Sequence, residues 1–73
     1  MPLKPLPFRI VRRKLLAADF LEVNQEGSHV KFASTTEAGT RTAIVPCHRE
    51  IPVGTLRSIL RQAGLTIDEW ESL

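Results

Sequence analysis

The sequence is poor in several residue types, and each shortage excludes a class of protein. The single cysteine, Cys47, has no second cysteine with which to form an internal disulfide or a thiolate zinc site. Apolar runs are only a few residues long, whereas a helix that crosses a bilayer needs about 20 apolar residues in a row. The start of the chain also lacks the long apolar region of a signal peptide. We therefore expect a cytoplasmic protein that makes no contact with a membrane.

The rest of the composition is that of a small folded domain. The chain has 73 residues, of which 42% are hydrophobic and 25% are charged, and these values are ordinary for a globular protein. At this length we expect residues 1–73 to form one domain, with the Pro-rich residues 1–7 as a flexible arm. The net charge is +2, and the charges are unevenly distributed: basic residues cluster at positions 9–14, and acidic residues cluster at positions 68–71. That balance is compatible with a polyanionic partner, and equally with a solvated basic helix face.

Hydrophobic spacing predicts the order helix, strand, strand, strand, helix. Residues 8–18 and the stretch between Pro52 and Gly64 carry apolar residues at helical spacing, so each is expected to form an amphipathic helix. Three stretches have the alternation of strands: residues 20–25, 29–33 and 41–45. The small polar residues 34–40 are predicted to form a loop. The expected fold is α+β, with two helices on one face of a three-stranded antiparallel sheet and a short final helix.

The same patterns predict which side chains are buried. Leu21 and Val23 alternate with polar residues, so they are expected to face the core from the first strand. Ile44 is expected to join the core that the second helix covers. Trp70 lies in the final helix, which begins with a capping box, and its indole N–H is expected to reach water or a carbonyl group.

A hairpin between the first two strands brings polar groups together. Glu26-Gly27 is predicted to be a tight turn, in which glycine supplies a positive φ. Because side chains alternate along a strand, Val30 and Phe32 should point to one face, and His29 and Lys31 to the other. The apolar pair can then be buried while the imidazole and the ammonium group face solvent.

These exposed groups suit proton transfer and the binding of an anion. Where the substrate is RNA and no metal takes part, the reaction needs a base for the 2′-hydroxyl proton, a proton donor for the 5′-oxygen and positive charge near the phosphate. An imidazole suits both proton transfers, since its unperturbed pKa is about 6.5. His29 is therefore the candidate acid/base, Lys31 a candidate for stabilising phosphate charge, and Ser28 a candidate for orienting the imidazole or binding phosphate. A strand histidine with no special task is the alternative interpretation.

Several segments resemble the HicA toxin family of bacterial type II toxin–antitoxin systems: Gly27-Ser28-His29, Val45 to His48, and Gly54 to Gly64. The resemblance runs from about Val11 to the C-terminus. It implies a fold similar to a double-stranded-RNA-binding domain, and the activity of an mRNA interferase that is a metal-independent endoribonuclease with no cofactor. It also implies that His29 is the catalytic residue and that a HicB-like antitoxin is the inhibitory partner.

Two positions depart from the pattern of that family. Glu26 stands where a basic residue is common, and Asp19 stands where glycine is common. A carboxylate beside the turn repels phosphate by an amount of order ~1 kcal/mol at an exposed site. We therefore expect Glu26 to weaken the affinity for RNA.

Residues of the hairpin turn and the second helix are expected to contact RNA. The expected set comprises Gly27, Ser28, Lys31, Arg57 and Arg61. The two arginines are one helical turn apart, and they either bind backbone phosphate or only solvate the second helix.

Other groups leave alternatives open. His48 is either a second acid or base or a surface residue, and Cys47 is interpreted as a small unreactive thiol rather than a nucleophile. Two histidines without a carboxylate cluster make a poor metal site, so no metal is expected. The rival functions are a non-catalytic RNA-binding module and a protein-interaction module.

Overall fold

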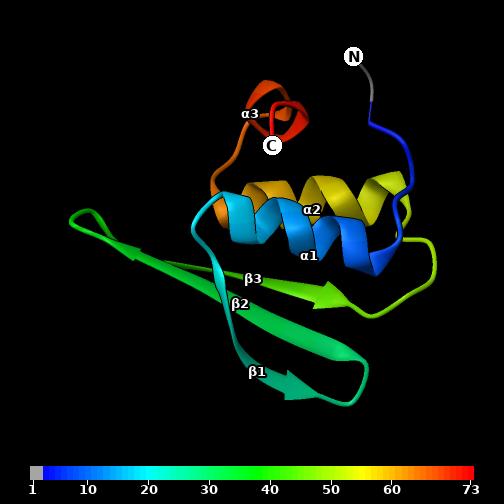
Figure 1. Ribbon diagram of the computed structural model, residues 1–73, viewed down its shortest axis with the longest axis horizontal. Coiled ribbons are helices and arrows are strands. Elements are labelled where there is room, and N and C mark those ends of the chain that lie inside the picture. Colours follow the sequence, from blue (N-terminus) through cyan, green and yellow to red (C-terminus); the bar gives the residue numbers. More distant parts are fainter. Residues whose placement is uncertain (1–2) are drawn as a thin grey trace.

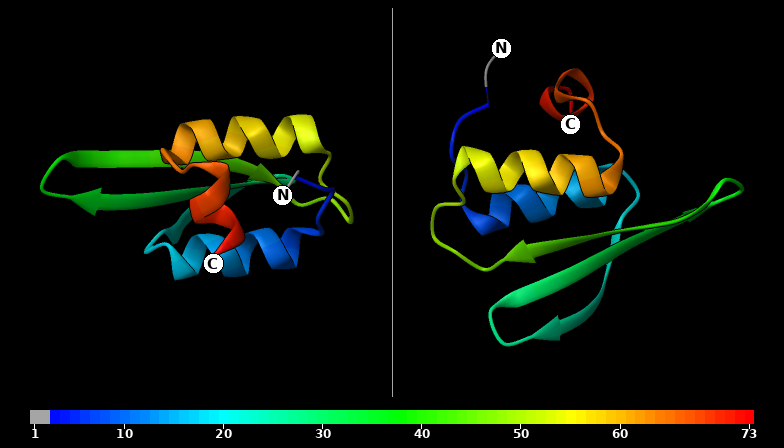
Figure 2. Two further views of the ribbon diagram at one scale, coloured as in Figure 1. Left: turned by 90° about the horizontal axis from the view of Figure 1, so that it is seen from above. Right: turned by 180° about the vertical axis from the view of Figure 1, so that it is seen from behind.

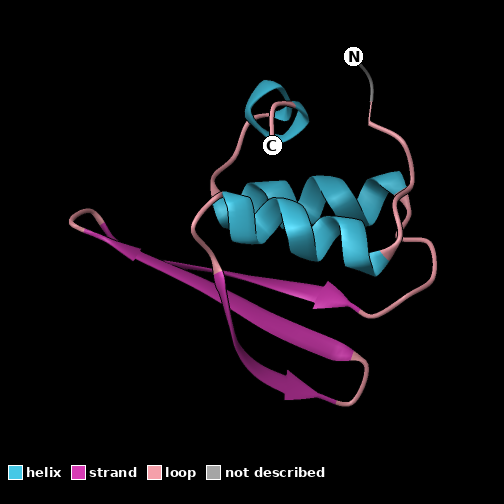
Figure 3. Cartoon of the chain, viewed as in Figure 1, coloured by secondary structure: helices cyan, strands magenta, loops and turns pink. Residues whose placement is uncertain are grey.

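The computed structural model describes residues 3–73 and contains the predicted order of elements. The helices and strands are α1 (Phe8–Ala17), β1 (Leu21–Glu26), β2 (His29–Thr36), β3 (Gly39–Pro46), α2 (Val53–Ala63) and α3 (Ile67–Glu71). The three strands form one antiparallel sheet in the order β1-β2-β3 (Figure 3). The predicted α+β fold is therefore confirmed.

The elements are stacked in layers. Helices α1 and α2 lie side by side on one face of the sheet, and α3 packs on the far side of this helix pair (Figures 1 and 2). The second face of the sheet carries no helix (Figure 1). The core lies between the covered face and the helices and extends to α3, and its largest fully buried side chains are Trp70, Phe32, Leu15, Ile51, Leu56, Ile59, Val11, Val30 and Val45.

Both long helices form where the apolar spacing predicts them. Helix α1 buries Val11 and Leu15, and α2 buries a stripe of four residues, Leu56, Ile59, Leu60 and Ala63. Each helix ends in a left-handed residue: Asp19 follows α1 with a φ of 68°, and Gly64 caps α2 with a φ of 73°. Glycine adopts this conformation without strain, whereas a residue with a Cβ atom pays a steric cost. Asp19 therefore bears this steric cost at the end of α1.

Helix α3 is held by its own cap and by a lysine of α1. The Thr66 hydroxyl accepts a hydrogen bond from Glu69 N, and the Glu69 carboxylate accepts one from Thr66 N, so the predicted capping box is confirmed. Lys14 Nζ donates to the carbonyl oxygens of Trp70 at 2.9 Å and Leu73 at 3.4 Å, and it lies 5.3 Å from the centroid of the Trp70 ring. Lys14 thus joins α3 to α1.

The environment of Trp70 differs from the expectation. Its ring is fully buried, and among the residues that the structure describes its Nε1 has no hydrogen-bond acceptor. The carbonyl partner expected for the indole N–H is therefore not found among these residues. The large apolar ring of this α3 residue is buried in the core together with its single polar atom.

Residues 3–7, part of the expected flexible arm, contact the rest of the protein. Leu3 is buried, and Leu6 forms an isolated antiparallel bridge with Ile51, in which each backbone N–H donates to the other residue's carbonyl. The prolines do keep this segment extended, and the extended chain then pairs and packs along the helix layer. The remaining arm residues, Met1 and Pro2, lie outside the described residues.

The prediction that β1 has a buried apolar face is wrong. Leu21 and Val23 are 66% and 55% exposed, and every residue of β1 is exposed. The strand lies at the sheet edge farthest from the helices (Figure 1), and its register shifts between Glu22 and Asn24. Glu22 is therefore opposite Phe32, on the covered side, where Arg12 of α1 forms an ion pair with it.

The position predicted for Ile44 is also wrong. Residues directly opposite each other on neighbouring strands share a face, and Ile44 is opposite Lys31, so its side chain lies on the open face and is 41% exposed. Its neighbours Ala43 and Val45 are buried instead. The backbone N–H of Ile44 is still satisfied, since it donates to Gln62 Oε1 of α2 at 3.0 Å.

The predicted loop at residues 34–40 is mostly strand. Strands β2 and β3 pair as far as Thr36 and Gly39, which leaves only Glu37 and Ala38 between them. This hairpin projects beyond the helices (Figures 1 and 2). Its residues are small and polar because little packs on them there, and the threonines are still suited to a strand.

Candidate functional site

The hairpin between β1 and β2 positions the histidine that the sequence singled out. Glu26 is opposite His29 in the register, so the loop consists of Gly27 and Ser28 and lies one residue later than predicted. Gly27 has a φ of 60°, as the first loop residue of such a tight turn requires. Two hydrogen bonds stabilise the turn: Gln25 Nε2 donates to Gly27 O at 3.2 Å, and Cys47 N donates to Ser28 O at 2.6 Å.

The two faces of β2 divide as predicted. Val30 and Phe32 are 2% and 0% exposed beneath the helices, whereas His29 and Lys31 are exposed on the open face. The alternation follows directly from the pleat of the strand. The imidazole and the ammonium group are therefore accessible to a large ligand.

Five residues of the open face surround one hollow of about 460 Å³: Asn24, Glu26, His29, Lys31 and Ile44. The register explains the set, because Glu26 is opposite His29, and Asn24 and Ile44 flank Lys31 from the two neighbouring strands. A carboxylate, an imidazole, an ammonium group and a carboxamide thus line the same hollow. These groups can transfer protons and bind an anion.

The other histidine and the cysteine lie outside this hollow. His48 and Cys47 follow the end of β3 and are both exposed. The backbone carbonyl of His48 accepts a hydrogen bond from Phe8 N at 3.2 Å. His29 is opposite Pro46 in the register, two residues before His48, but His48 is not among the residues that line the hollow. Only one of the two imidazoles, that of His29, therefore lines the hollow.

The candidate arginines lie in the helix layer. Arg57 and Arg61 are exposed on α2, whose buried residues pack toward the covered face of the sheet. His29 lies on the opposite face. The predicted RNA contacts therefore form two groups, one at the hairpin turn and one on α2.

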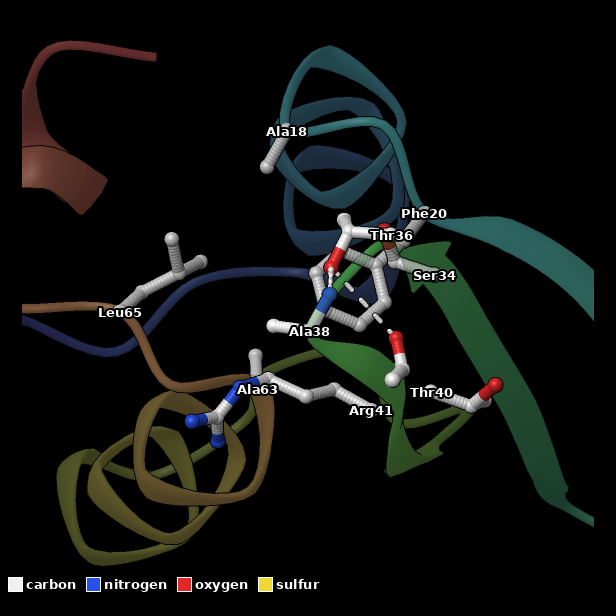
Figure 4. Close-up of a pocket in the computed structure, with 10 residues that line it drawn as sticks. Ala18, Phe20, Ser34, Thr36, Ala38, Thr40, Arg41, Ala63 and Leu65 are labelled. Carbon is white, nitrogen blue, oxygen red and sulfur yellow. Dashed lines mark hydrogen bonds between the residues drawn. The ribbon is translucent and has the colours of Figure 1, made fainter.

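A second hollow, of about 410 Å³, lies between the projecting hairpin and the ends of α1 and α2 (Figure 4). Small and apolar side chains such as Ala18, Phe20 and Leu65 line much of it, and the Thr36 hydroxyl accepts from Ala38 N at 3.2 Å. Arg41 is its one charged residue, and its guanidinium lies so close to Gly64 that a Cβ there would be 2.6 Å from Arg41 Cζ. This hollow has no group suited to proton transfer.

Two further features bear on function. Within residues 3–73, no group of three or more His, Cys, Asp or Glu side chains is placed to hold a metal ion. Among the same residues, no helix has the length and apolar character needed to span a membrane.

Two comparisons with known proteins bear on identity. No curated protein matches the chain. The family described as HicA toxin of bacterial toxin–antitoxin systems matches residues 8–65. The match begins at the first residue of α1, includes the whole sheet with His29, and ends just beyond the cap of α2. It thus covers most of the 73 residues, and the chain belongs to the HicA toxin family.

Proposed function

We propose that this toxin is a metal-independent endoribonuclease that cleaves mRNA, with His29 as a catalytic acid/base. The observation that carries the proposal is the placement of His29, which is exposed beside Lys31 on an open sheet face within the region that matches the family. The proposed substrate places the activity in the cytoplasm.

The chemistry of the hollow supports proton transfer on RNA. The 2′-oxygen attacks phosphorus, the bond to the 5′-oxygen breaks, and the products end in a 2′,3′-cyclic phosphate and a 5′-hydroxyl. An imidazole exchanges protons near neutral pH, so His29 can act on one of these oxygens. The ammonium group of Lys31 then stabilises the negative charge that develops on the phosphate.

The RNA contacts are proposed in two groups. Gly27 and Ser28 offer backbone and hydroxyl groups at the turn, and Lys31 offers a charge in the hollow. Arg57 and Arg61 lie in the helix layer, so any phosphate that they bind belongs to RNA some distance from the cleaved bond. Such contacts raise affinity without distinguishing sequences.

The open face also suggests how the toxin is restrained. A HicA toxin has a cognate antitoxin, and we assign that role here to a HicB-like protein that covers the hollow. Exposed Leu21 and Val23 of β1 and Ile44 on the open face of β3 supply apolar surface for such a contact. Binding there blocks His29 directly.

The test is RNA cleavage by purified wild-type and His29→Ala proteins in excess chelator. His29→Ala should lower the rate by roughly 10²- to 10⁴-fold, because proton transfer by the imidazole is lost. The fold and antitoxin binding should persist, since the side chain is exposed and its removal opens no cavity. DNA and 2′-O-methyl RNA should resist cleavage even when bound.

His48→Ala is the matched control, because it removes an exposed imidazole that does not line the hollow. It should cleave at the wild-type rate. Wild-type activity that disappears with chelator, or a folded His29→Ala protein with full activity, would falsify the mechanism. Wild-type protein that binds RNA without cleaving it would instead indicate the non-catalytic RNA-binding module.

A further inference from the structure

One imidazole cannot contact both oxygens that exchange protons in the proposed reaction. In phosphoryl transfer the attacking and leaving oxygens lie roughly in line on opposite sides of phosphorus. A group that contacts the 2′-hydroxyl therefore does not also contact the 5′-oxygen in the same transition state. A second titratable group is needed within reach of the same phosphate.

Glu26 is the residue that meets this geometric requirement. It is opposite His29 across the loop of Gly27 and Ser28, and both side chains line the hollow. Directly opposite residues have Cβ atoms only about 4.5 to 5.5 Å apart, which is a separation that one phosphate can bridge. The two hydrogen bonds that hold the turn, from Gln25 and Cys47, also hold this pair in register.

The Glu26 carboxylate is also free to react. Within residues 3–73, the one ion pair joins Glu22 to Arg12 on the covered side of the sheet. Glu26 forms no ion pair with any of these residues. Lys31 also lines the hollow and carries a charge. It lies on β2, two residues after His29, and β2 is the strand paired with the one that carries Glu26. Strand β3 contributes Ile44 and no titratable group. Lys31 thus offsets the repulsion between the carboxylate and the phosphate.

We propose that Glu26 is a second catalytic residue, which accepts the 2′-hydroxyl proton while protonated His29 donates a proton to the 5′-oxygen. This inference rests on the proposed function. The bond from the 2′-oxygen to phosphorus forms as the bond to the 5′-oxygen breaks, and no oxidant or metal is required. General base catalysis uses the ionised form of a carboxyl group, and general acid catalysis uses the protonated form of an imidazole. Proton exchange with water then restores both.

The test compares kcat and KM of wild-type and Glu26→Gln proteins on RNA in excess chelator. Glutamine keeps the size of the side chain but does not accept the proton at neutral pH, so kcat should fall roughly 10²- to 10⁴-fold. KM should stay the same or fall, because a negative charge near phosphate is removed. If Glu26 only repelled phosphate, the same substitution would lower KM and leave kcat unchanged.

Glu22→Gln is the matched control. It makes the same change of charge on the same strand, but on the covered side of the sheet and outside the hollow. Its kcat should remain at the wild-type value. Circular dichroism of each variant verifies that the fold persists.

Two further measurements distinguish a catalytic role of Glu26 from a structural one: the dependence of kcat on pH, and the rescue of activity by an added carboxylate. Wild-type kcat should fall in acid as the carboxylate is protonated, and in alkali as the imidazolium loses its proton. Glu26→Gln should lose the acidic limb and keep the alkaline one. Glu26→Ala should regain activity when formate is added, because the small carboxylate can enter the space that the side chain leaves.

The outcomes separate this inference from the proposed function. Loss of cleavage in His29→Ala together with wild-type kcat in Glu26→Gln overturns the role of Glu26 alone. Full activity in folded His29→Ala, or no chelator-resistant cleavage by the wild type, overturns both proposals. A fall in kcat for Glu26→Gln with an unchanged acidic limb also overturns the assignment of Glu26 as the base.

Discussion

The two faces of the sheet differ in what covers them and in which residues they carry. The covered face packs Val30, Phe32 and Val45 beneath α1 and α2, and all three are almost fully buried. The open face presents His29 and Lys31, which alternate with the first two of these residues along the same strand. One strand therefore supplies stability on one side and the candidate chemistry on the other. Substitutions at neighbouring positions of β2 should accordingly affect different properties.

The largest expected effect is on the covered face. Phe32→Ala removes a fully buried ring that packs at 6.4 Å from the ring of Phe8, and it should lower the free energy of unfolding by about 3 to 5 kcal/mol. For so small a domain that is a large part of the total stability. Urea and thermal unfolding of Phe32→Ala and Lys31→Ala measure the contrast. Equal losses in the two variants would show that the faces are not divided in this way.

Lys31→Ala should instead affect RNA. Stability should change by no more than about 0.5 kcal/mol, since the side chain is exposed. The affinity for single-stranded RNA should fall about fivefold, which corresponds to about 1 kcal/mol for one exposed charge near a phosphate. The slope of log K against log salt should also become shallower by about 0.7. Lys4→Ala removes an exposed charge outside the hollow and serves as the control in filter-binding titrations. An equal loss in both variants would indicate only a general effect of charge.

The smallest expected effect lies where the chain passes from the helix layer to the sheet. Asp19→Gly should raise the free energy of unfolding by about 0.5 kcal/mol, because glycine adopts the φ of 68° without steric cost. Ala17→Gly is the neighbouring control in helical conformation, and it should lower stability by up to about 1 kcal/mol. Chemical denaturation distinguishes the two signs. Destabilisation by both changes would argue against relief of backbone strain at Asp19.

The sequence predicted the helices better than the strands, and the reason is physical. A helix presents one stripe to the core, so the spacing of Leu56, Ile59 and Leu60 identifies the buried side without reference to any other element. The face of a strand depends on its partners. Leu21 alternates correctly and is still exposed, because β1 is an edge strand that packs little against the helices.

The candidate site was partly predictable for the same reason. The exposed placement of His29 and Lys31 follows from the alternation within one strand, and the structure agrees with it. Glu26 was missed as a member of the hollow because the turn was predicted one residue too early, which placed Glu26 in the loop rather than in β1. The signal was present, since a loop of two residues ending in Ser28 pairs Glu26 with His29.

By itself, the sequence determined the order of elements, the buried stripes of α1 and α2, and the caps at Gly64 and Thr66, because each depends on neighbours along the chain. Tertiary structure alone decided the exposure of β1, which face of β3 is covered, the burial of Leu3, and the grouping of Glu26 with His29 and Lys31. These features depend on register and on how far the helices extend over the sheet. Local spacing does not encode either quantity, because both arise from contacts between segments that are distant in the chain.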